Sequence, residues 1–326
     1  MKYKNIKKFL SFALALTIIT VLSMPAYAYS AGKEKIFSIN EWDEYQRVVS
    51  MSDNELLEAG YTKEDITQIR NFNYEEEIKK RAALDDETLK AYRYTDHEIK
   101  ELREAAEMEK IPESVMRSIS SSTMTSELKY QGNGSYVAGG STMYYVDMKY
   151  SWSWSRIPYF TLMDMVAIAY NSSVSNQFIY TSVSGYNLRC HFQPLSSMDS
   201  AISQVKNWTY STSKPNSISA KFAIGYYDDS GALTHFVYSG YGFFRLTNRS
   251  NNAQLYVDAA YGHATISINP SYSVSVSGAS IGLSFSSGVD EQHCTGWFYE
   301  DFTITRNRIY YGVVYGKNNT GGTPSN

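Results

Sequence analysis

The alternation of serine with apolar residues between Ser271 and Ser286 constrains this chain more than any other feature of its sequence. The phase of the alternation switches after Gly278-Ala279, as a two-residue loop requires, and glycine at the first loop position fits a type II′ turn. The pattern therefore predicts a β-hairpin with an apolar face and a serine-glycine face. Its expected pairs are Tyr272 with Phe285, Val274 with Leu283, and Val276 with Ile281.

This hairpin has two interpretations. An apolar face opposite a hydroxyl face is typical of a membrane-inserting hairpin, whose lipid-facing residues would be Tyr272, Val274, Val276, Ile281, Leu283 and Phe285. Its strands are shorter than the about 9–11 residues that cross a bilayer, and Pro270 would interrupt a longer first strand. The shortness favours the other interpretation, a surface hairpin with one face buried and one wet.

Period-two alternation recurs along the neighbouring sequence, for instance over Ile218–Tyr227, where Asp228-Asp229-Ser230-Gly231 then supplies a turn. Charged residues are few there: residues 118–326 hold 12 bases and 11 acids. We therefore expect an antiparallel β-sandwich or barrel over 126–316, followed by a disordered tail over 317–326.

The preceding part has a different composition. Residues 31–117 carry 14 bases and 22 acids, Pro is absent from them until Pro112, and apolar residues recur at helical spacing. Capping boxes are expected for Ser38 with Glu41, Ser52 with Glu55, and Thr95 with Glu98. The sequence thus predicts an α+β protein, with helical hairpins over 29–125 before the β domain. Neither part has the basic excess of a nucleic-acid-binding protein.

A 33-residue repeat runs through the helical segment. It aligns Leu56 with Leu89, Tyr61 with Tyr94, Thr62 with Thr95, Ile66 with Ile99, and Arg70 with Arg103. Gly60 suits the left-handed position that ends a helix, whereas Arg93 does not, so the second copy is expected to end differently. The run LLEAGYTKEDITQIR resembles ubiquitin-associated and related three-helix modules, which implies a small protein-binding module. A helical spacer or pro-region is the alternative.

Residues 1–28 have the order of a signal peptide: the basic MKYKNIKK, an apolar run over 9–24, and Ala26-Tyr27-Ala28 before the expected cleavage. We expect a protein that is secreted, extracellular or associated with the cell envelope. In an oxidising compartment Cys190 and Cys294 are expected to form a disulfide, with free thiols as the alternative. A zinc site at Cys190-His191 and His293-Cys294 is disfavoured, because adjacent strand residues point to opposite faces.

Recognisable catalytic motifs are absent. The sequence has no H-E-x-x-H and no phosphate loop, so no cofactor or metal is expected and no catalytic residue is assigned. Asp164 lies inside an apolar stretch and is the candidate acid if the protein is a hydrolase. Trp152 and Trp154 share one face of a strand; exposed they would stack on sugar rings, and buried they would be core.

The whole chain resembles a loose group of exported proteins of Gram-positive bacteria, most of them without assigned activity. The resemblance is carried by Gly60-Tyr61-Thr62, Tyr94-Thr95, Trp152-Ser153-Trp154 and the hairpin after Gly262-His263. It implies export and architecture, and no site residue. We expect a secreted, non-enzymatic protein that binds a cell-surface, envelope or extracellular component, such as a cell-wall or surface glycan or a protein. A membrane-active pore-forming protein and a secreted hydrolase are the alternatives.

Overall fold

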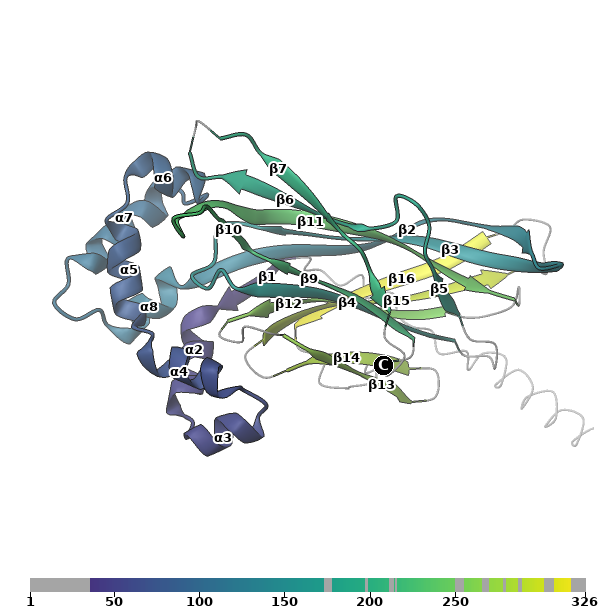
Figure 1. Cartoon of the computed structure of the whole chain (residues 1–326), viewed down its shortest axis with the longest axis horizontal. Helices are drawn as coiled ribbons and strands as arrows, with labels where there is room; N and C mark the ends of the chain where they lie inside the picture. Colours follow the sequence, from purple (N-terminus) through teal and green to yellow (C-terminus); the bar gives the residue numbers. More distant parts are fainter. Residues whose placement is uncertain are drawn as a thin grey trace, which may run out of the picture.

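A computed structural model describes residues 36–317 except 173–177, 197–198, 211–213, 215, 250–254, 266–269, 278–279, 287–288 and 302–307. The expected signal peptide, the turn at Gly278-Ala279 and the tail after Lys317 lie outside the described residues. Within them, helices come first and mostly antiparallel sheets follow, so the fold is α+β as the sequence predicts. Figure 1 shows the helices gathered at one end of the long strands.

The helical segment contains the repeat in both sequence and structure. Its helices are α2 (Glu41–Ser50), α3 (Asp53–Glu58), α4 (Lys63–Asn71), α5 (Tyr74–Ala82), α6 (Asp86–Ala91), α7 (Asp96–Ala106) and α8 (Glu113–Ile119). The starts of α3 and α4 are displaced by 33 residues from those of α6 and α7. The two arginines make equivalent contacts: Arg70 binds the Asp53 carboxylate and the Met51 carbonyl, and Arg103 binds Asp86 and Leu84.

Both copies of the repeat end their first helix in the same way, which corrects one prediction. Gly60 has φ +93° and Arg93, at the equivalent position, has φ +67°. A left-handed arginine is strained. Its guanidinium donates to the Trp154 carbonyl at 2.8 Å and lies 5.2 Å from the Tyr238 ring centroid, so contacts with the β part hold the second copy in this conformation.

The capping predictions hold for Ser52 and Thr95, each of which forms a capping box with the glutamate three residues on. The prediction for Ser38 is wrong. Ser38 lies in a strand, and Asn40 accepts the hydrogen bond that caps α2. Glu41 takes no part in a capping box with Ser38, and its side chain is buried.

Two open antiparallel sheets and a separate hairpin follow. The strands are β1 (Ile36–Asn40), β2 (Ser121–Ala138), β3 (Ser141–Trp154), β4 (Met163–Ser172), β5 (Ile179–Thr181), β6 (Leu188–Pro194), β7 (Ile202–Lys206), β8 (Thr209–Tyr210), β9 (Ser217–Ala223), β10 (Gly225–Tyr227), β11 (Leu233–Asn248), β12 (Leu255–Ala264), β13 (Tyr272–Ser277), β14 (Ser280–Phe285), β15 (Val289–Asp301) and β16 (Arg308–Lys317). Sheet A has the order β1-β2-β3-β11-β6-β7, with β5 and β10 also on β11, and sheet B has the order β16-β15-β12-β4-β9-β8.

Sheets A and B pack face to face around one apolar core, so the architecture is a sandwich whose sheets are not closed. Trp152 is central to this core. Its indole stacks on Phe222 of β9 and contacts Tyr261 of β12, while its own strand belongs to sheet A. Gly240, its partner on β11, makes room for it, because a Cβ there would lie 2.3 Å from the indole.

The helical segment shares its core with the β part. Helix residues such as Leu56, Tyr74 and Leu102 pack in the same cluster as Tyr159 and Phe236 of the β part. The boundary also differs from the predicted one: β1 lies before the helices and pairs with β2, which begins at Ser121. The first strand is therefore part of sheet A, and the helices are an insertion between neighbouring strands.

The expected disulfide is absent: Cys190 and Cys294 are both buried and are not bonded to each other. Ser126, Trp152, Gly240 and Cys190 are successive partners across β2, β3, β11 and β6, which puts Cys190 three strand spacings, about 14 Å, from Ser126. The Cys294 thiol lies 3.1 Å from the Ser126 hydroxyl. Disulfides need Cα atoms about 4.4–6.8 Å apart, so this row of residues keeps the two thiols from bonding.

Gly240→Ala should lower the free energy of unfolding by about 1–3 kcal/mol, because the new methyl group overpacks against Trp152 and the Arg189 carbonyl. Urea denaturation measures the change. Gly132→Ala is the matched control, since no atom lies within 4 Å of its added Cβ. Equal stability of the two variants would contradict the packing.

Alkylation without reductant tests the cysteines. Because both thiols are buried, and burial raises the pKa of Cys190 to about 12, the native protein should react slowly. In denaturant without reductant, intact mass should rise by two alkyl groups. A mass that rises only after reduction would show that the two cysteines form a disulfide.

Candidate functional site

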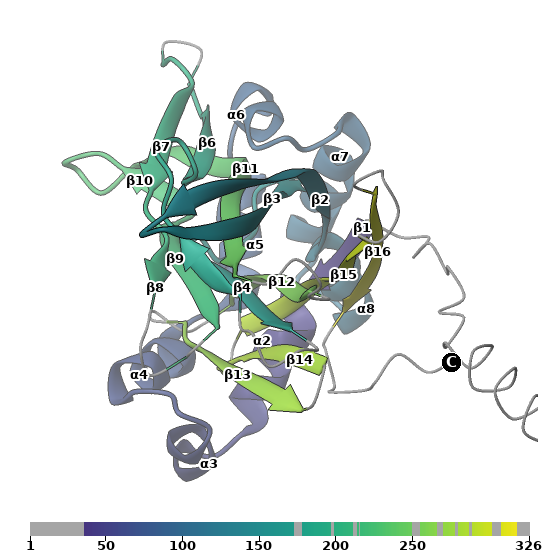
Figure 2. The same cartoon turned by 90° about the vertical axis from the view of Figure 1, so that its right-hand side faces the viewer.

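The β13–β14 hairpin forms a third layer on the outer face of sheet B. Figure 2 shows it on the side of β4 and β12 that faces away from β3 and β11. The hairpin pairs Tyr272 with Phe285, Val274 with Leu283, and Val276 with Ile281, which is the register that the sequence predicts. It hydrogen-bonds as a two-stranded sheet of its own and belongs to neither large sheet.

The apolar face of the hairpin is covered by sheet B. Tyr272, Ile281 and Leu283 are 6%, 8% and 2% exposed, and Val274 and Phe285 are partly buried with them. The side chain of Val276 lies outside the described residues. Ser273, Ser275 and Ser284 are exposed, so the hydroxyl face is wet.

The surface under the hairpin is made of small and flexible side chains. Met165, Ala167 and Ala169 of β4 and Ala260 of β12 line it. Gly262 of β12 is also part of the fit, because a Cβ there would lie 2.6 Å from the Phe285 ring. The other face of β4 packs into the core of the sandwich, so β4 is apolar on both faces.

Two carboxylates hold the backbone of β14. One Asp258 oxygen accepts the Leu283 N–H at 2.8 Å, and one Glu291 oxygen accepts the Phe285 N–H at 2.6 Å. The remaining oxygen of each carboxylate contacts His293: Nδ1 lies 2.9 Å from Asp258, and Nε2 lies 3.0 Å from Glu291. We call Asp258, Glu291 and His293 the hairpin clamp.

With both carboxyl groups ionised, the geometry of the clamp favours a charged imidazole. Carboxylates only accept hydrogen bonds, and a neutral imidazole has one N–H, so both contacts of His293 are satisfied together only by the imidazolium. Burial lowers the pKa of His293, but hydrogen bonds and charges from Asp258 and Glu291 outweigh it and raise the pKa to about 9. The cation is therefore present at neutral pH.

A second imidazole between two carboxylates lies on the inner face of sheet B. His263 Nδ1 is 3.0 Å from Asp164, and Nε2 is 3.3 Å from Glu41. Glu41 also accepts the backbone N–H groups of Tyr159 and Phe160, at 2.7 and 2.8 Å. We call Glu41, His263 and Asp164 the helix clamp, because it joins α2 to β4 and β12. Against burial, which lowers it, Asp164 and Glu41 raise the pKa of His263 to about 10.

Asp164, the candidate catalytic acid, belongs to the helix clamp and is fully buried. It accepts hydrogen bonds from the Tyr261 hydroxyl, His263 and the Ala264 backbone N–H. Trp154 donates to the same Tyr261 hydroxyl at 3.0 Å. This carboxylate is therefore buried and bonded as a structural group.

Trp152 and Trp154 are core residues, which decides between the two interpretations that the sequence left open and excludes them as a candidate glycan-binding pair. They are 3% and 1% exposed. Their shared face is the inner face of sheet A, and sheet B covers it. The alternation with serine identified the shared face correctly, but it could not say which face water reaches.

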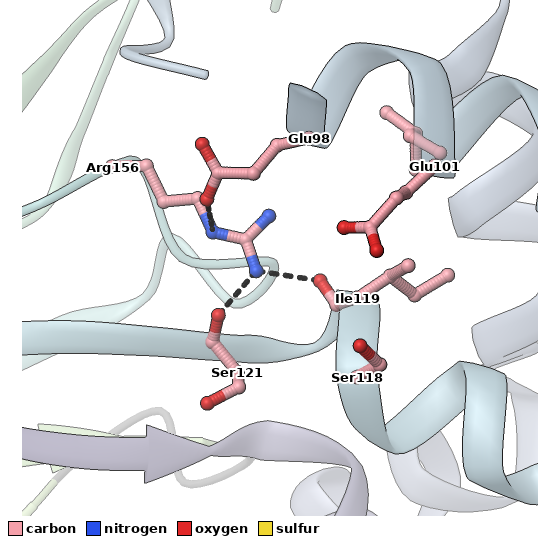
Figure 3. Close-up of a pocket in the computed structure, with 7 residues that line it drawn as sticks. Glu98, Glu101, Ser118, Ile119, Ser121 and Arg156 are labelled. Carbon is pink, nitrogen blue, oxygen red and sulfur yellow. Dashed lines mark hydrogen bonds and ion pairs between the residues drawn. The ribbon is translucent and has the colours of Figure 1, made fainter. Parts of the chain in front are cut away.

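One small cavity lies where α7, α8 and β2 meet. It has a volume of about 120 Å³ and is lined by Glu98, Glu101, Leu102, Ser118, Ile119, Ser121 and Arg156. Figure 3 shows the Arg156 guanidinium directed at the carbonyls of Ile119 and Ser121 and at Glu98. Drug-sized ligands fill about 300–1,000 Å³, so this cavity is a junction between helices and sheet with room for water.

None of the described helices has the length and apolarity to cross a bilayer. In the described part of the chain, no three His, Cys, Asp or Glu side chains are arranged to hold a metal ion. In both clamps the imidazole nitrogens face carboxylate oxygens directly.

The sequence contains a signal for the hairpin clamp. Asp258 and His263 interrupt an otherwise apolar strand, and His293 and Glu291 lie on one face of its neighbour β15. Buried ionisable groups need partners, so Asp258 is predicted to pair with His293 and Glu291, which lie on the same face of the neighbouring strand. The partner Glu41 is 222 residues from His263 and could not be found from strand register.

Asp164→Asn should lower the free energy of unfolding by about 3–5 kcal/mol, because it leaves the buried His263 cation short of one counterion. Asp229→Asn, in an exposed turn, is the control and should change it by less than about 0.5 kcal/mol. Chemical denaturation at neutral pH measures both. If Asp164→Asn lowers the free energy of unfolding by less than about 0.5 kcal/mol, as the control does, the charged clamp is contradicted.

Comparison of the sequence with known protein families gives no match, and comparison with curated proteins gives none. Among solved structures, the chain is similar to Clostridium perfringens delta-toxin, with 10% sequence identity and a TM-score of 0.22. That match covers 56% of this chain and 91% of the toxin chain. A TM-score this low carries no argument about function.

Proposed function

We propose that this protein acts on lipid bilayers and that residues 265–288 insert as a β-hairpin. The observation that carries the proposal is the docked hairpin itself. An amphipathic hairpin, bonded into neither sheet, is stored with its apolar face covered and its hydroxyl face wet. A hairpin of this composition has a second stable environment, in which lipid replaces sheet B.

The connections of the hairpin support this proposal. β12 and β15 pair with each other along their length, up to Ala264 opposite Val289. Residues 265–288 therefore connect the two strands of a ribbon, and within this connection β13 and β14 lie on the ribbon's own sheet. Release of this connection would let the ribbon grow in its existing register.

The sequence fits that longer ribbon. Continuing the register by eight residues from Ala264 and Val289 places Tyr272 opposite Ile281, so the docked pairing of β13 with β14, in which Tyr272 faces Phe285, would be exchanged for a new one. Apolar residues occupy every even position from Ile266 to Val276, with Pro270 among them, and odd positions hold hydroxyl or amide side chains. On the other strand Ala279, Ile281, Leu283 and Phe285 keep the apolar phase. All of these fall on one face of the ribbon.

The strands of the longer ribbon are long enough to cross a bilayer. Each strand gains about 11 residues (265–275 and 278–288), and about 9–11 residues cross a bilayer. Pro270 removes one hydrogen bond from the ladder. A single ribbon would leave two backbone edges without partners in hydrocarbon, so several chains must contribute ribbons to one closed barrel. Its lumen would be lined by serine, threonine and glycine.

Binding to a cell surface fits this proposal as the step that brings the chain to its target. With Trp152 and Trp154 buried, the described residues identify no glycan platform for that step. Export, which we also propose from the leader, would place the protein where it meets the membranes of other cells.

A lysine on the lipid-facing side of the ribbon should block insertion. Phe285→Lys should lower dye release from vesicles of phosphatidylcholine and phosphatidylglycerol by about tenfold or more, since a lysine near the bilayer midplane costs about 2–4 kcal/mol. Phe285 is half-buried in the docked state and its backbone contact to Glu291 is kept, so the folded protein should remain.

Ser284→Lys is the matched control. Ser284 is the adjacent residue on the exposed hydroxyl face, which would face the lumen, so release should be retained. Thermal unfolding of each variant shows that both are folded. Absence of release by the wild-type protein from zwitterionic and anionic vesicles between about pH 5 and about pH 10 would contradict the proposal.

A further inference from the structure

We propose that the hairpin clamp is a proton-controlled latch: the hairpin stays docked while His293 is a cation and is released when His293 loses its proton. This inference rests on the proposed function for its purpose, but its chemistry is independent of membranes. It assigns a regulatory role to Asp258, His293 and Glu291, which the storage of an amphipathic hairpin does not by itself require.

The hairpin and His293 share the two carboxylates of the clamp. Each divides its oxygens between the hairpin and His293: Asp258 holds the Leu283 N–H and Nδ1, and Glu291 holds the Phe285 N–H and Nε2. The hairpin backbone is therefore bound to the imidazole through one bridging group on either side. No titratable group of the hairpin itself takes part in these four contacts.

Deprotonation of His293 removes one donor from the clamp. When the imidazolium becomes neutral, only one nitrogen keeps a proton, so one carboxylate faces a lone pair in place of an N–H. Two carboxylates then remain close together with no cation between them, under a layer that excludes water. Docking of the hairpin holds them in this arrangement, and release of the hairpin admits water to both.

The two carboxylates that contact His293 favour its protonated form. Asp258 comes from β12 and Glu291 from β15 itself. In the apolar layer under the hairpin, β4 contributes Met165, Ala167 and Ala169, and β14 contributes Leu283. In that layer β13 contributes Tyr272, whose hydroxyl bonds Ser217 and whose ring centroid lies 4.1 Å from Lys214 Nζ. The side chains of β16 lie outside the described residues.

The sign of the pH dependence follows from the raised pKa of His293. A histidine whose pKa is higher when docked than its ordinary value stabilises docking fully below about pH 6.5. That contribution is lost as the pH rises through the docked pKa of about 9. The latch is therefore closed at neutral and mildly acidic pH and opens in alkaline solution.

Brief digestion with subtilisin, which works across this pH range, tests the latch without any membrane. Cuts within 265–288, located by mass spectrometry and corrected with an unfolded peptide, should rise by about tenfold or more between about pH 7.5 and about pH 10 in the wild-type protein. Cuts within α5 and α7 should not rise, which separates hairpin release from global unfolding.

Two variants make the test specific. His293→Gln lacks the cation at every pH, so its hairpin should be cut at about pH 7.5 as fast as the wild-type hairpin is at about pH 10. Glu291→Gln should remove the pH dependence. Its amide oxygen can accept the Phe285 N–H while its NH₂ donates to a neutral Nε2, and Nδ1–H keeps Asp258.

Hairpin cutting that does not change with pH in the wild-type protein, or a Glu291→Gln variant with unchanged pH dependence, would overturn the latch. Dye release distinguishes this result from failure of the proposed function. Alkaline hairpin cutting without dye release would leave the latch standing and remove the membrane activity, whereas dye release with pH-independent cutting would do the reverse.

Discussion

Buried imidazolium groups, each held between two carboxylates, fix what lies on both faces of sheet B. On the inner face His263 bridges Asp164 and Glu41, which ties α2 to the sandwich. On the outer face His293 bridges Asp258 and Glu291, which hold β14 by its backbone. Such a group is stable in the interior only while its charge and all its hydrogen bonds are matched. The same arrangement therefore serves a permanent junction in one place and a reversible contact in the other.

What separates the two junctions is the apolar area around them. The helix clamp lies between a helical segment and a sandwich that share a large core, in which Tyr159 and Phe236 pack with the helices. The hairpin rests on a thin layer of Met165, alanines and half-covered side chains, and its second face is wet. Loss of one cation can release a hairpin held by so little area, but it cannot detach the helical segment. Stability is thus distributed unevenly, with its low end at the element proposed to move.

Much of the fold was predictable because it rests on local periodicity. The register of the β13–β14 hairpin, the 33-residue repeat and two of three capping boxes follow from spacing alone. The errors arise where distant segments decide the outcome. Arg93 takes a left-handed conformation because the Trp154 carbonyl binds its side chain, and β1 is a strand because β2 offers it an edge. Cys190 and Cys294 remain thiols because of the row of partners across sheet A.

The sequence by itself determined the division into a charged helical part and a hydroxyl-rich β part, and it determined which residues of each strand share a face. Only the tertiary structure decided which of those faces water reaches, because periodicity is identical for a face covered by a sheet, by lipid or by nothing. It buried Trp152 and Trp154, covered the apolar face of the hairpin, and brought Glu41 to His263. Those contacts depend on how sheets stack, which no spacing along the chain encodes.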